Sequence, residues 1–193
     1  MKKFISLKLI VFSFILVTSA VSYSNPKIEA GTGANSIKAG LDNEADGEES
    51  SAFGFHNITD KSGSSAFGNG NVAIGENSSA FGFHNIASKI HSSAFGSSNE
   101  VDGDFSSAFG FKNKISGKWS SAFGNQYEVT GEKSGTFGVG EYNGQYKYKN
   151  EGNNSYMIGN YNKIAKDSND NFILGNNVGY LSNSVDKKVW TYN

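Results

Sequence analysis

Aromatic and small residues recur along this chain at a spacing of 14 residues, far longer than the period of a helix or a strand. The pentapeptide SSAFG returns at this spacing, and a variant, SGTFG, continues the series. A repeat this regular indicates one small structural unit stacked on copies of itself. The Phe residues of the series, which we term the Phe ladder, are Phe53, Phe67, Phe81, Phe95, Phe109, Phe123 and Phe137.

One repeat, taken as residues 106–119, is too short for a pair of helices and suits two short strands joined by two turns. Side chains alternate between the two faces of a strand. Ser107, Phe109 and Phe111 therefore share one face, and the other face carries only Ser, Ala and Gly. A second, shorter strand is expected around Ile115.

Two further residue types keep the same spacing and are expected at the bends between strands. Asn and Gly tolerate positive φ, which tight corners require. The Asn series is Asn57, Asn71, Asn85, Asn99 and Asn113, and the Gly series is Gly75, Gly103, Gly117 and Gly131.

Stacked coils give each strand parallel neighbours at roughly 4.8 Å, so like residues stand over like residues. A face of small residues lets the two strands of a coil lie close together in a thin roll. The Phe ladder then packs either in the roll interior with Ile115 and its equivalents or between chains. Because one thin roll makes a poor core, association is expected, and a homotrimer would close three such faces around one axis.

The ends of the chain differ from the repeats. Lys2 and Lys3, the apolar run 5–17 and the small residues near Ala20 and Ser22 form the pattern of a secretory signal peptide over residues 1–22. The alternative is a membrane anchor that is retained, although the run is short for a span. No later stretch is apolar enough to cross a membrane as a helix. We assign residues 23–180 to the roll, with about ten coils, and 181–193 to a tail.

Composition narrows the classes of function. The chain has no Cys, so an exported protein would do without disulfides. Loss of residues 1–22 would remove Lys2, Lys3 and Lys8 and change the formal net charge from −1 to −4. This mildly acidic balance gives no support for nucleic-acid binding. The abundant Gly, Ser and Asn could suggest disorder, but the strict period argues against it.

SSAFG followed by Asn, an aliphatic residue and Gly at a 14-residue step resembles the head repeats of trimeric autotransporter adhesins, the YadA-like family. Residues 71–75, NVAIG, are especially similar, and the resemblance covers roughly residues 31–180. It implies a left-handed parallel β-roll, a β-solenoid, assembled as a homotrimer. It also implies display at the cell surface, on the outer membrane of a Gram-negative bacterium, and adhesion to a host extracellular-matrix protein or cell-surface receptor.

The chain departs from that family beyond the roll. No sustained heptad pattern of a coiled-coil stalk is present, and the tail after Leu174 is far short of a set of membrane strands. We therefore expect a head without its anchor or the product of a truncated gene. Such a head would be secreted if no anchor is supplied.

The period breaks twice near the end of the roll. The step from Phe137 to Ile158 is 21 residues and the next step, to Leu174, is 16. Extra residues in a stacked coil are expected to bulge outward as loops, here near 141–155. Three Tyr lie in the larger insertion, and Tyr is favoured at binding surfaces. We take Tyr142, Tyr146 and Tyr148 as candidate ligand-binding residues, with a solvated loop as the alternative.

A second set of aromatic residues has a period of 28 residues, two after the Phe ladder in alternate coils. If exposed, these residues form an apolar stripe of the kind that marks contact surfaces. The alternative is that they pack at the interface between chains. The set is Phe55, Phe83 and Phe111.

Residues suited to catalysis or metal binding are not brought together by the repeat. His56 and His84 are two coils apart, roughly 10 Å, too far to share a metal. The acidic residues in 42–49 suit a solvated turn, and no in-phase His–Asp pair would activate a Ser. We therefore predict no cofactor and a non-enzymatic adhesin head. The alternatives are a structural, self-associating surface or biofilm protein and a β-solenoid hydrolase, which would need a groove with paired carboxylates.

Overall fold

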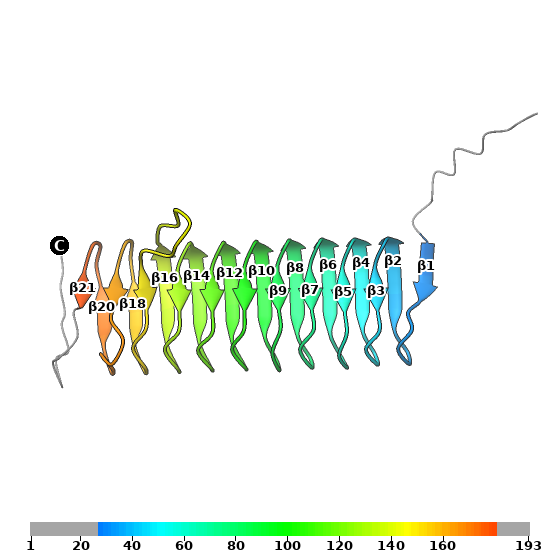
Figure 1. Cartoon of the computed structure of the whole chain (residues 1–193), viewed down its shortest axis with the longest axis horizontal. Helices are drawn as coiled ribbons and strands as arrows, with labels where there is room; N and C mark the ends of the chain where they lie inside the picture. Colours follow the sequence, from blue (N-terminus) through cyan, green and yellow to red (C-terminus); the bar gives the residue numbers. More distant parts are fainter. Residues whose placement is uncertain (1–26, 181–193) are drawn as a thin grey trace, which may run out of the picture.

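The computed structural model describes residues 27–180, which form a stack of coils with a sheet on each side (Figure 1). All assigned strands but β1 run parallel to their neighbours, and no helix occurs in this range, which confirms an all-β parallel β-roll. The larger sheet contains β1 (Lys27–Ala30), β2 (Ile37–Leu41), β4 (Ser51–Phe55), β6 (Ser65–Asn69), β8 (Ser79–Phe83), β10 (Ser93–Ser97), β12 (Ser107–Phe111), β14 (Ser121–Asn125), β16 (Gly135–Val139), β18 (Tyr156–Ile158) and β20 (Phe172–Leu174).

The smaller sheet is built from two-residue strands on the opposite side of each coil. It contains β3 (Glu44–Ala45), β5 (Ile58–Thr59), β7 (Val72–Ala73), β9 (Ile86–Ala87), β11 (Glu100–Val101), β13 (Lys114–Ile115), β15 (Glu128–Val129), β17 (Lys149–Asn150), β19 (Lys163–Ile164) and β21 (Gly179–Tyr180). The predicted signal peptide, 1–22, and tail, 181–193, lie outside the described residues.

Pairing between coils keeps the 14-residue register that the sequence predicts. In the larger sheet Phe95 pairs with Phe81 on one side and with Phe109 on the other. At the N-terminal end the direction of pairing changes, because β1 pairs antiparallel with β2. This strand covers the first edge of the larger sheet, which would otherwise present unpaired backbone groups.

The interior of the roll is made of small residues from the larger sheet and aliphatic residues from the smaller one. Ala94 and Ala108 are fully buried, as are Val101 and Ile115 opposite them. The Phe ladder lies outside, with successive rings stacked at 4.7–5.0 Å from Phe53 to Phe123. The interior placement of the Phe ladder, one of our two alternatives, is therefore wrong: the space between the sheets admits Ala and not Phe.

The Asn series has a different role from the one that its φ tolerance suggests. None of its members has positive φ. Their side chains are buried, and Asn85 is typical: its amide nitrogen lies 2.8 Å from the Gly96 carbonyl oxygen and 3.0 Å from Oδ1 of Asn71. Its own Oδ1 accepts a hydrogen bond from the backbone N–H of Asn99, 3.1 Å away. The series is thus an internal ladder of amides that satisfies backbone groups at the corner.

The positive φ values lie one residue before each Asn, as at His56 and His84, where φ is 53°. The Gly series also differs from expectation, since Gly75 and Gly117 are absent from the positive-φ set. These glycines are needed for close approach between coils: a Cβ on Gly117 would lie 2.0 Å from the carbonyl oxygen of Gly131.

Candidate recognition surface

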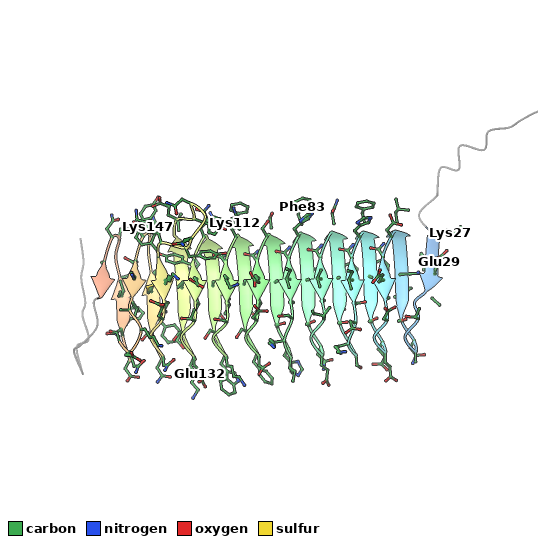
Figure 2. All side chains as sticks on the ribbon, viewed as in Figure 1. Lys27, Glu29, Phe83, Lys112, Glu132 and Lys147 are labelled. Carbon is green, nitrogen blue, oxygen red and sulfur yellow. The ribbon has the colours of Figure 1, made fainter. Side chains whose placement is uncertain are left out.

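The larger insertion lies at one corner of the roll, between β16 and β17. Two residues lie between the end of β14 and the start of β15, whereas nine lie between the end of β16 and the start of β17. All seven extra residues are therefore in this loop. Tyr142 and Tyr146 form an antiparallel bridge within it, and their rings meet edge to face with centroids 4.9 Å apart. Figure 2 shows Lys147 of this loop at the same edge of the roll as Lys112 and Phe83.

The loop is folded onto the earlier coils rather than projecting freely. Lys112 follows β12, in the coil before β14. Its ammonium lies 4.2 Å from the centre of the Tyr142 ring, which is a cation–π contact. Burial, together with the negative charges of Glu100 and Glu128, raises the pKa of Tyr146 to about 12. Tyr142 and Tyr146 thus lie over the charged outer face of the smaller sheet, half-buried.

Tyr148 does not join these two residues. It packs against the buried cluster that contains Tyr127, Met157 and Ile164, and its ring centroid lies 5.3 Å from that of Tyr161. Among the three candidate tyrosines, the structure therefore brings Tyr142 and Tyr146 together and places Tyr148 at the base of the loop.

The 28-residue set lies along the same edge as the loop. Phe55, Phe83 and Phe111 are 39%, 50% and 41% exposed. Phe55 and Phe83 stack on His56 and His84, with centroids 4.0 and 4.1 Å apart. Phe111 lies beside the loop, because the Lys112 ammonium is 5.9 Å from the centre of the Phe111 ring and also contacts Tyr142. The set is exposed in a single chain and continuous with the loop surface.

The opposite edge of the roll carries an aromatic series that we did not predict, the corner stack of His91, Phe105 and Trp119. Its ring centroids are 5.0 and 6.2 Å apart, and Phe105 and Trp119 are each 51% exposed. Lys133 in the next coil extends it with an ammonium 5.6 Å from the Trp119 ring. The three residues are 14 apart in the sequence, so this signal was available in the repeat.

An open groove of about 610 Å³ runs between the inserted loop and the smaller sheet. The roll contributes charged side chains to it and the loop contributes Tyr142, Gln145 and Tyr146. Because these charged side chains point outward from β11, β13, β15 and β17, the groove faces away from the Phe ladder.

The described residues contain no group of His, Asp and Glu that could hold a metal ion. Within 27–180, no helix is long and apolar enough to cross a membrane.

Comparison with protein families identifies the repeat. Residues 45–71, 60–85 and 87–113 match the family model described as the YadA head domain repeat. Residues within 45–113 thus carry YadA-like head repeats. The match falls on the most regular coils, where the Phe ladder, the buried Ala and the Asn amides all keep the same register. YadA head repeats indicate an adhesin-type surface protein. No curated protein shows significant similarity to the chain.

Proposed function

We propose that this YadA-like head is a non-enzymatic adhesin that acts as a homotrimer on the surface of a Gram-negative bacterium and binds a host matrix protein or cell-surface receptor. The observation that carries the proposal is the match of residues 45–113 to YadA head repeats on a roll whose exposed aromatic residues are regularly placed.

The homotrimer is supported by the Phe ladder. Its rings are half-buried by their neighbours, and Phe123 and Phe137 are 43% and 61% exposed. Ile158 and Leu174 continue the stripe at 39% and 40% exposure. An apolar stripe that runs the length of a roll is typical of an association surface. Three copies around one axis would cover it and leave the loop edge free.

The edge formed by Phe55, Phe83, Phe111 and the inserted loop is the proposed recognition surface. It combines exposed aromatic area with polar and charged groups, as binding surfaces do. Three copies in a homotrimer would raise avidity for clustered receptors. Tyr148 supports this surface from below, since it packs on the buried cluster.

The second candidate function, a self-associating surface or biofilm protein, is favoured by the corner stack. Phe105 and Trp119 are bulky residues at φ of 55° and 54°, a conformation that costs a non-glycine residue energy. Their exposure on the edge opposite the loop would suit contacts between heads.

The test compares two sets of variants of the mature protein. Tyr142→Ser with Tyr146→Ser should weaken binding to a panel of matrix proteins and host cells, with head-to-head clustering unchanged. Trp119→Ser with Phe105→Ser is the matched control on the other edge and should leave host binding intact. Clustering without saturable binding to any host surface, lost only in the Trp119 and Phe105 variant, would instead establish self-association.

A further inference from the structure

The groove beneath the inserted loop has the size of a small-ligand site. Its volume of about 610 Å³ falls in the range of sites that enclose small molecules. One wall is the Tyr142–Tyr146 pair, whose edge-to-face packing gives it a fixed shape. The floor is the row of side chains on β11, β13, β15 and β17.

The charges on the floor are matched within the protein. Lys114 lies 2.7 Å from Glu100, and Lys149 lies 2.5 Å from Glu128. These two ion pairs neutralise four of the five charged side chains that line the groove. A polycationic or polyanionic partner would have to break them.

Lys112 supplies the fifth charge. Among residues 27–180 no carboxylate lies within ion-pair distance of it, and its ammonium rests on the Tyr142 ring. The groove therefore carries an excess of one positive charge. A flexible ammonium with three donors suits a single carboxylate on a ligand.

The remaining lining groups favour a ligand rich in hydroxyl groups. Ser98, Gln145 and the two Tyr provide hydroxyl and amide groups, and the lining contains no aliphatic side chain. An apolar peptide side chain would find no pocket of the kind that anchors protein interfaces. The Tyr146 hydroxyl, like that of an ordinary tyrosine, is protonated at neutral pH and can donate a hydrogen bond. Tyrosine rings also offer apolar surface to the C–H face of a sugar.

We infer that this groove binds a sugar that carries one carboxylate, with Lys112 facing the carboxylate and Tyr142 and Tyr146 contacting the ring. The inference rests on the proposed function, since it names the part of a host receptor or matrix glycan that the loop edge would contact. Two sources share this chemistry, a terminal nine-carbon sugar acid and a hexuronate.

The experiment is calorimetric titration of the mature protein with 3′-sialyllactose, with a glucuronate-ended disaccharide, and with lactose as the uncharged probe. At least one acidic probe should bind ten-fold or more tightly than lactose, and the acidic probe that does so identifies the source. Lys112→Gln should remove this preference without changing lactose binding. Lys112→Arg should retain it. Lys118→Gln, on the opposite edge and paired with Asp104, is the matched control and should behave like the unaltered protein.

Equal binding of the three probes, or binding of none, would overturn the inference and needs no variant to interpret. So would an unchanged preference in Lys112→Gln with a wild-type melting temperature. Host-cell binding measured on the same samples separates the two proposals: adhesion that persists without sugar binding overturns this inference and leaves the proposed function intact.

Discussion

The phenol of Tyr127 and the backbone of Asn162 are joined by a hydrogen bond, with the Asn162 N–H donating to the Tyr127 oxygen at 3.0 Å. The same hydroxyl donates to the carbonyl oxygen of Gly159 at 3.1 Å. In the regular coils these two backbone groups are satisfied by the Asn one coil earlier, as Asn85 does for Gly96 and Asn99.

Tyr127 thus replaces an amide that the inserted coil lacks. It occupies the Asn position of its own coil, and the next coil has Tyr148 in place of Asn. The longer Tyr127 side chain reaches past that coil and meets the ladder where it resumes at Asn162. The loop can therefore be accommodated because one buried side chain bridges the interruption.

Tyr127→Phe should destabilise the protein by about 1–3 kcal/mol, because it removes the partner of the buried Asn162 N–H and of the half-buried Gly159 carbonyl while keeping the ring. The measurement is urea unfolding followed by circular dichroism. Tyr142→Phe, which changes a half-buried tyrosine in the loop, is the control and should have a much smaller effect. Equal effects in the two variants would show that the Tyr127 hydroxyl does not bridge the ladder.

The repeat predicted the strands, their parallel register and the small face that forms the interior, because side-chain alternation and size alone decide these features. It did not decide whether the Phe ladder lies inside the roll or between chains, because the period carries no information on the distance between the two sheets. It missed the Asn amides, because the same residue type suits both a strained corner and a buried hydrogen-bond ladder. The sequence could not predict that the inserted loop folds over Lys112, because no other coil contains a loop of this kind.

Close approach between coils can be tested at two glycines that share a positive φ. A Cβ on Gly82, where φ is 118°, would lie 2.1 Å from the carbonyl oxygen of Gly96. At Gly144 in the loop, where φ is 98°, nothing lies within 4 Å. Both Ala variants carry backbone strain, of order 1–3 kcal/mol, but only Gly82→Ala adds a clash with the next coil.

We therefore expect Gly82→Ala to reduce the melting temperature far more than Gly144→Ala, or to prevent folding. Thermal unfolding of both variants under identical conditions gives the comparison. A similar small decrease in both would mean that the coils can separate at Gly82 at little cost.

Alkaline pH should destabilise the loop edge. The folded pKa of Tyr146 is about 12, above its ordinary value near 10, because burial and nearby carboxylates disfavour the phenolate. The folded state thus retains a proton that the unfolded chain loses, so this contribution to stability is complete below about pH 10 and is lost as the pH rises toward 12. Lys114, whose pKa is raised chiefly by its hydrogen bond to Glu100, changes stability in the same direction.

The free energy of unfolding should accordingly fall between pH 9 and pH 11.5, and Tyr146→Phe should reduce the fall. Urea titrations at the two pH values provide the measurement. Tyr156→Phe, an exposed tyrosine distant from Glu100 and Glu128 in the sequence, serves as the control. An identical fall in the unaltered protein and in Tyr146→Phe would contradict the assignment.

Phe95 stacks between Phe81 and Phe109 at 5.0 and 4.9 Å and is half-buried in a single chain. If a homotrimer covers the Phe ladder, Phe95→Ala removes a fully buried ring and should cost about 3–5 kcal/mol per chain. The apparent stability of the unaltered protein and of both variants should then depend on protein concentration, because unfolding is coupled to dissociation. Phe83→Ala, at the exposed edge, should cost less than about 1 kcal/mol. Light scattering at each concentration reports the assembly directly, and a folded, monomeric wild-type chain at micromolar concentration would rule out the trimer and leave the Phe ladder as a solvent-exposed surface.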